Sequence, residues 1–193
     1  YERGRAVEER QQDVEDFWNG GALDPESNVQ FGEGGAGTFS DGKLNTLVKD
    51  KFGRSRYVLE TFVKFGAPED ILYVAKPHVG TDVLRDVISR MRQEIIRLGG
   101  TFHFSTKVTD LHIEDGRISK IELNHKEWKD VSGVILAIGH SARDTFEMLY
   151  ERKVPMMAKS FAVGMRVEHP QDMINESQYG RNADMTLLPT AAY

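Results

Sequence analysis

The chain has 193 residues, with 25 Lys and Arg against 30 Asp and Glu, so its formal net charge at pH 7 is −5. Since one domain takes roughly 100–200 residues, this length predicts one domain or parts of two. The acidic balance argues against a nucleic-acid partner, because such binding faces are basic, and no apolar run approaches the roughly 18 residues of a membrane span. The absence of cysteine excludes disulfides, thiolate metal sites and a dithiol relay within the chain, and it fits a reducing, cytoplasmic compartment.

Helical periodicity marks the first hundred residues. The spacing of Val7, Val14, Phe17 and Trp18 predicts a first helix, which Gly20-Gly21 ends. The charged run Glu8-Glu9-Arg10 within it is interpreted as a solvated helix face. Residues 56–65 form a second amphipathic helix that Gly66 closes.

The clearest helix spans residues 81–98. Its apolar side chains recur at i, i+3, i+4, i+7 and i+11, which predicts one buried face made of Leu84, Val87, Ile88, Met91 and Ile95. Thr81 is its expected N-cap, and Gly99-Gly100 ends it. We expect this face to pack against a β-sheet.

A change to strand periodicity follows the long helix. Alternation over residues 101–105 predicts a strand, and residues 108–113, 118–123 and 128–131 predict an antiparallel meander, with Asp115-Gly116 in its first turn. The continuous apolar run 134–138 is typical of a central strand covered on both faces, and we expect it to lie parallel to residues 102–104. Residues 161–168 alternate like a further strand.

The order of these elements predicts an α/β domain with a parallel sheet and an inserted antiparallel meander. Ser141 and Asp144 form a capping-box pattern for a helix after the apolar strand. Arg143 and Asp144 are interpreted as an ion pair on that helix surface. Two interpretations of His140 remain open, a polar lid beside a ligand and a simple cap.

A glycine-rich loop over residues 23–42 carries two incomplete nucleotide motifs. Gly32 to Gly37 matches G-x-G-x-x-G, but the Asp41-Gly42 turn interrupts the helix that this motif needs. Residues 37–44 approach the Walker A loop, but Leu44 stands where a magnesium-binding hydroxyl belongs, which disfavours an NTPase. Glycine density lets backbone approach a ligand, and polar groups cluster here, so ligand contact is favoured over a floppy surface loop; those groups are Thr38, Ser40, Asp41 and Lys43.

Two long strings carry a family resemblance, Gly32 to Leu44 and Ala137 to Asp144, together with Glu2-Arg3-Gly4 and residues 77–82. The chain resembles the uncharacterised FAD-dependent dehydrogenases, within the two-dinucleotide-binding-domain flavoproteins of glutathione-reductase type. The resemblance covers essentially the whole chain. It implies an internal fragment that lacks the N-terminal G-x-G-x-x-G turn of such proteins.

The resemblance also implies a domain plan. Residues 1–44 and 77–150 would form part of a Rossmann-like FAD/NAD(P)-binding domain, with 108–131 as the inserted meander. Residues 45–76 and 151–193 would be parts of a second, substrate or cap domain.

The resemblance implies a set of residues along FAD. Glu2, followed by Arg3, would end the second parallel strand and accept hydrogen bonds from the adenosine ribose, although a solvated terminal carboxylate is the alternative. The backbone of Val108 would meet the adenine, or Val108 would be plain core. The remaining residues implied near the cofactor are Gly34, Gly35, Ala36, Gly37, Thr38, Ser40, Asp41, Lys43, Ala137, Ile138, Gly139 and His140.

The expected activity is that of an FAD-dependent oxidoreductase. With no cysteine in the chain, flavin would exchange hydride directly with a small-molecule substrate or with NAD(P)H, and Lys43 would stabilise the reduced flavin. No residue identifies the catalytic groups, the substrate or the oligomeric state, and the histidine spacing predicts no metal site. The rival interpretation is a non-catalytic Rossmann-like binding or scaffold domain, since a fold does not itself give an activity.

We expect the isolated 193-residue chain to hold FAD weakly or not at all, although the full-length protein holds it. The helix N-terminus that would neutralise the FAD diphosphate lies outside the chain. Losing two or three charge-assisted hydrogen bonds of about 1.5–3 kcal/mol each weakens binding by a factor on the order of 10² to 10⁶. The loop over residues 23–42 would then be poorly ordered. Visible absorbance of the purified chain is the measurement, and a yellow protein would contradict the expectation.

Overall fold

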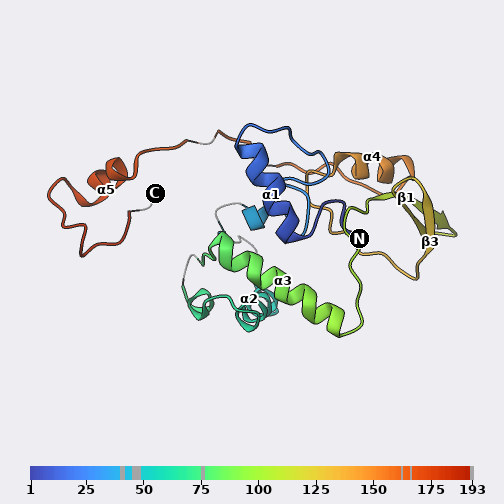
Figure 1. The fold of residues 1–193 in the computed structure, drawn as a ribbon, viewed down its shortest axis with the longest axis horizontal. Helices are drawn as coiled ribbons and strands as arrows, with labels where there is room; N and C mark the ends of the chain where they lie inside the picture. The colour runs from blue at the N-terminus through green and yellow to red at the C-terminus, as the bar shows by residue number, and fades with distance from the viewer. Residues whose placement is uncertain (40–41, 45–48, 75–76, 162, 166, 192–193) are drawn as a thin grey trace. The chain divides into compact units, whose positions relative to one another are not determined.

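The computed structural model describes residues 1–39, 42–44, 49–74, 77–161, 163–165 and 167–191. The chain divides into two compact units, Tyr1–Pro155 and Met156–Tyr193. The regular elements of the described residues are helices and one three-stranded antiparallel sheet, so the chain is mixed α/β (Figure 1). None of the described helices is both long and apolar enough to cross a membrane.

The helical part of the first unit gathers α1 (Val7–Trp18), α2 (Arg54–Lys64) and α3 (Thr81–Arg97), with short 3₁₀ turns η1 (Ala36–Phe39) and η2 (Glu69–Leu72). These bounds agree closely with the three predicted helices. α3 packs against α1 and η1, and α2 packs against η2 (Figure 1). One apolar cluster lies between α2, η2 and α3, and its buried members are Ala67, Ile71, Val79, Leu84 and Val87.

The buried face of α3 differs in two ways from the prediction. Leu84 and Val87 are buried and Ile88 and Met91 pack at the edge of the same cluster, but Ile95 is 43% exposed. The partners of this face come from α2 and η2 rather than from the sheet, because amphipathic spacing identifies the buried face but not what covers it. The N-cap is Gly80 without a side-chain cap, so the prediction of Thr81 as N-cap is wrong.

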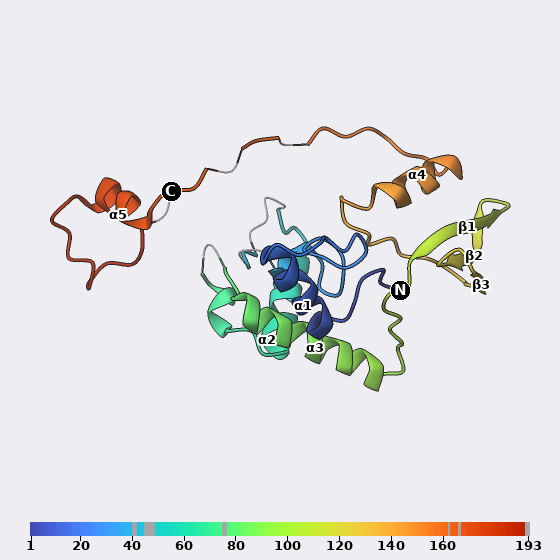
Figure 2. The ribbon, with the colours of Figure 1, turned by 45° about the horizontal axis from the view of Figure 1, so that its top comes forward.

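The predicted meander is confirmed. β1 (Val108–Glu114), β2 (Arg117–Leu123) and β3 (Glu127–Asp130) pair antiparallel in the order β1-β2-β3. Asp115 and Gly116 have positive φ angles of 49° and 74° in the first turn, as the Asp-Gly signal requires. α4 (Arg143–Glu151) packs beside β1, with Leu149 against the buried side chains of the sheet, Leu111, Ile121 and Leu123 (Figure 2).

The predicted parallel strand pair is wrong for this structure. Neither residues 102–104 nor residues 134–138 form a strand, and Ile135 is 94% exposed. A continuous apolar run indicates a segment suited to burial on both faces, but burial requires neighbouring strands and covering layers. In the described residues no strand of this chain pairs with residues 134–138.

The second unit contains α5 (Gln171–Tyr179). The strand predicted over residues 161–168 is not formed at the residues of this range that the structure describes. Residues 45–76 and 151–193 as parts of one second domain stay a prediction; the structure packs α2 with α3 and makes Met156–Tyr193 a separate unit.

Replacement of Leu84 by Ala tests the face assigned to α3. Leu84 is 6% exposed, so truncation leaves a cavity and should lower the free energy of unfolding by about 2–5 kcal/mol. Ile95→Ala is the matched control on the same helix, and it should change stability by less than about 0.5 kcal/mol, as is usual for surface positions. Urea denaturation followed by circular dichroism measures both variants. Equal losses would mean that the helix buries a different face.

Candidate functional site

A cavity of about 420 Å³ lies in the first unit between the N-terminal segment, the glycine loop, the sheet and residues 133–142. This volume falls within the range of small-molecule sites. Many residues that the sequence placed near a cofactor line it, although they come from distant parts of the chain: Glu2, Arg3, Gly35, Ala36, Val108, Ala137, Ile138, Gly139 and His140.

Other predicted residues do not line this cavity. Gly34 lies behind it, where a Cβ would meet the Thr38 hydroxyl at 2.1 Å and Ile88 at 2.5 Å, so its glycine serves close packing. Thr38 is fully buried, and its Oγ1 has no hydrogen-bond partner in the described part of the chain. Lys43 pairs with His78 in an isolated antiparallel bridge, and Gly37 also lies outside the lining. Ser40 and Asp41 lie outside the described residues.

Glu2 is held at the cavity wall by backbone groups. Its amide donates to the carbonyl of His103 at 2.9 Å, and its own carbonyl accepts from Thr106 at 2.9 Å. The carboxylate Oε1 accepts from the amides of Gly4 at 2.9 Å and Gly32 at 3.0 Å. No hydrogen bond of the described residues uses Oε2, so this oxygen can accept from a ligand hydroxyl in the cavity.

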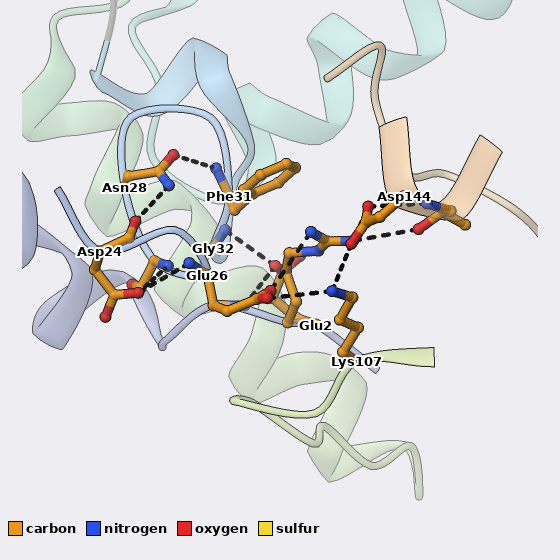
Figure 3. A network of polar contacts seen from close by, with 12 residues as sticks. Glu2, Asp24, Glu26, Asn28, Phe31, Gly32, Lys107 and Asp144 are labelled. Carbon is orange, nitrogen blue, oxygen red and sulfur yellow. Dashed lines mark hydrogen bonds and ion pairs between the residues drawn. The ribbon is translucent and has the colours of Figure 1, made fainter. Parts of the chain in front are cut away.

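Four charged side chains form an ion-pair cluster at the polar edge of the cavity (Figure 3). Arg3 donates to Asp144 Oδ1 at 2.8 Å and lies 3.4 Å from Glu26. Lys107 lies 2.5 Å from Asp144 Oδ2 and 3.2 Å from Glu26. The Arg3 guanidinium also stacks on the Phe31 ring, 4.3 Å from its centre. The cluster therefore joins the N-terminal segment, the loop, the start of β1 and α4.

Asp144 is the carboxylate that both cations of this cluster share. Burial opposes its ionisation, but hydrogen bonds from Arg3 and Lys107 outweigh burial and hold its pKa well below the usual range. Two predictions for this region are wrong. Asp144 pairs with Arg3 across the fold rather than with Arg143 on the helix surface, and the N-cap of α4 is Ala142 without a side-chain bond, so the capping box with Ser141 is absent. A spacing pattern cannot reveal that a stronger partner approaches from elsewhere in the chain.

Arg10 organises the glycine loop from inside. Its guanidinium donates to the carbonyls of Asn28 at 2.8 Å, Val29 at 2.9 Å, Gly32 at 3.3 Å, Glu33 at 2.7 Å and Gly35 at 2.9 Å. Arg10 is fully buried, so its interpretation as part of a solvated helix face is wrong. These bonds hold the loop carbonyls to α1, and the expected poor order of the loop stays a prediction.

A second buried charge ties the same loop to two helices. Glu33 Oε2 accepts from the amide of Val7 at 2.9 Å at the start of α1, and from Arg92 of α3 at 2.9 Å. Burial raises the pKa of Glu33, and the hydrogen bond from Val7 and the charge of Arg92 oppose that rise. A carboxylate at a helix N-terminus meets the positive end of the helix dipole, so Glu33 replaces the cap that Ala6 lacks.

The chemistry of the cavity suits an amphipathic ring-bearing ligand. Apolar side chains, among them Val108, Val131 and Met148, provide walls for a flat ring, and Glu2 provides an acceptor for hydroxyl groups. Gly35 and Gly139 give open backbone, because a Cβ at either one would meet nothing within 4 Å. These features fit part of FAD. Among the described residues no group of three His, Asp or Glu side chains is placed to hold a metal ion.

Several functional positions carried only a partial signal in the sequence. Arg10 is three residues after Val7 and four before Val14, so helical spacing places it on the buried face. Lys107 precedes Val108, yet nothing local indicated its contacts with Asp144 and Glu26. Phe31 lines the cavity and lies against the Arg3 guanidinium. The residues around it in the loop show no periodic apolar spacing that would have indicated this position.

Comparison with known proteins gives two matches. Residues 160–193 match a model of the FAD-dependent protein C-terminal domain-like family. An uncharacterized protein of Clostridium beijerinckii is 51% identical over 193 residues, which is all of this chain but 36% of that protein. The chain therefore spans about a third of the length of this relative, and the family match hints at an FAD-related protein.

The shifted pKa of Asp144 predicts a pH-dependent contribution to stability. A carboxylate whose pKa is lower in the folded state stabilises that state at pH values above its unfolded pKa of about 3.9. This contribution to stability is lost as the pH falls below that value. Asp144→Asn should therefore be less stable than wild type at pH 7, and the difference should shrink as pH falls below about 4. Urea denaturation at a series of pH values measures it. Asp130→Asn, at an exposed carboxylate of β3, should match wild type throughout; a constant deficit for Asp144→Asn would contradict the assignment.

Proposed function

We propose that the protein is an FAD-dependent oxidoreductase and that this chain supplies one wall of its FAD site. The observation that carries the proposal is the cavity in which Glu2, Val108 and residues 137–140 meet. The family resemblance implies these same positions as cofactor contacts. The family match over residues 160–193 also supports an FAD-related protein.

Glu2 would accept from the hydroxyl groups of the adenosine ribose. Its Oε1 is anchored by two backbone amides, which fixes the carboxylate plane and leaves Oε2 for the ligand. The hydrogen bonds of Glu2 with His103 and Thr106 set the N-terminal segment beside residues 103–106, as neighbouring strands of a Rossmann-like domain would lie. We propose such a domain for residues 1–44 and 77–150, with residues 108–131 as its insertion.

The apolar walls would exclude water from the ring system of the cofactor. Val108 and Ile138 lie at the cavity, and their neighbours in the core hold the walls rigid. When bound, flavin supplies the hydride chemistry, and the protein supplies binding, orientation and local charge. Lys43 does not line this cavity, so its proposed role beside the reduced flavin has no support from the cavity geometry.

The reaction would proceed without a cysteine relay from this chain, which contains no cysteine. Hydride would pass directly between flavin and a small-molecule substrate, or between flavin and NAD(P)H. A non-catalytic scaffold is the second candidate, and the exposed apolar segment around Ile135 favours a role in assembly with further protein. Bound flavin that is reduced by NAD(P)H would distinguish an oxidoreductase from a scaffold.

The test is FAD binding by the full-length protein. Wild type should purify yellow and release FAD on denaturation, and Glu2→Gln should weaken FAD binding by roughly 10- to 100-fold, because one charge-assisted hydrogen bond is worth about 1.5–3 kcal/mol. Glu9→Gln, at an exposed carboxylate of α1, is the matched control and should bind like wild type. A colourless full-length protein with no affinity for added FAD would overturn the proposal.

A further inference from the structure

Arg10 lies behind the cavity wall and does not line the cavity. It is fully buried on α1, and it spends its hydrogen bonds on five loop carbonyls, of which those of Gly32 and Gly35 belong to lining residues. An arginine of this kind is costly to bury, because its charge leaves water. A solvated helix face does not explain why this arginine is buried.

A short path connects this guanidinium to the cavity. Gly32 accepts from Arg10 through its carbonyl at 3.3 Å, and it donates through its amide to Glu2 Oε1 at 3.0 Å. The contact is close, since a Cβ at Gly32 would stand 2.3 Å from Arg10 Cδ. Gly4 packs on the other side, where its Cβ would meet Gly32 Cα at 2.5 Å. Arg10, Gly32 and Glu2 thus form one continuous stack from the helix to the cavity.

We propose that Arg10 is a positioning residue for the ligand cavity: it fixes Gly32, through Gly32 the carboxylate of Glu2, and through Gly35 the glycine wall. The identity of the ligand as FAD rests on the proposed function. The placement of Glu2 by Arg10 rests on the contacts alone and can be measured without a ligand.

Only a guanidinium meets these demands. Nε and Nη2 each donate to one loop carbonyl, and the two hydrogens of Nη1 are shared among the carbonyls of Gly32, Glu33 and Gly35. Arg reaches these carbonyls from three nitrogens in a planar fork, whereas the three donors of Lys lie on one nitrogen, so Lys must leave some of the five loop carbonyls unpaired. Burial lowers the pKa of Arg10 to about 10, while the negative charges of Glu2 and Glu33 act to raise it. The side chain therefore stays protonated at neutral pH and supplies positive charge to both carboxylates.

The experiment uses the full-length protein with Arg10→Lys and Arg10→Ala. Val87→Ala is the control, because Val87 is fully buried in the separate cluster around α3 and its truncation lowers stability without removing a loop contact. Three quantities are measured: the Kd for FAD, the hydrogen-exchange rate of the Gly32 amide without ligand, and the recovery of both in Arg10→Ala on addition of guanidinium or, for comparison, ammonium ions.

Both Arg10 variants should weaken FAD binding by roughly 10- to 100-fold, the loss that is typical when groups that orient the ligands of a metal site are removed. The Gly32 amide should exchange faster in both variants. Guanidinium, but not ammonium, should restore both properties of Arg10→Ala, whereas Val87→Ala should change neither once global unfolding is subtracted. If the variant only lost stability, guanidinium and ammonium ions would not differ in their effect.

The outcomes separate the two proposals. Wild type without affinity for FAD would overturn the proposed function, and the exchange of Gly32 would still decide whether Arg10 places Glu2. Normal FAD binding by Arg10→Lys and Arg10→Ala would overturn the positioning role while leaving the proposed function intact. Unchanged Gly32 exchange in both variants would overturn the path through Gly32.

Discussion

The buried guanidinium of Arg10 is the interaction on which the arrangement of the first unit depends. A loop rich in glycine has high conformational entropy when unfolded and few side chains to pack. Arg10 compensates for this by collecting five loop carbonyls on one rigid fork. Because this guanidinium belongs to α1, the helix sets the position of the loop, and the loop in turn forms part of the cavity wall.

Two further charged groups complete this framework. Glu33 returns from the loop to the N-terminus of α1 and to Arg92 of α3, so the loop is fixed from both sides. Asp144 joins Arg3 and Lys107, which both line the cavity. Arg10 and Glu33 are buried charges, which stabilise only when they are paired and hydrogen-bonded, and both meet that condition through partners distant in sequence. Asp144, whose side chain is 42% exposed, also pairs with partners distant in sequence.

The cavity is therefore a product of charge pairing more than of the sheet. β1, β2 and α4 contribute apolar lining from their own small core, while Glu2, Arg3 and Lys107 supply the polar edge. This division suits a ligand with a flat ring and hydroxyl groups. This division supports the proposal of FAD binding. The polar side chains that would orient the cofactor are themselves held in place by backbone amides and ion pairs.

The sequence by itself determined the local elements. Helical spacing located α1, α2 and α3, and the Asp115-Gly116 turn located the meander, because periodicity and turn conformation depend on neighbouring residues. The family resemblance, and no local pattern, implied Glu2, Val108 and residues 137–140 as cofactor contacts. Only the tertiary structure decided which partners these residues have: that Arg10 binds the loop carbonyls, that Asp144 binds Arg3, that α3 faces α2, and that residues 134–138 form no strand. The physical reason is that burial and ion pairing arise between segments distant in the chain, and no local pattern encodes the distance between them.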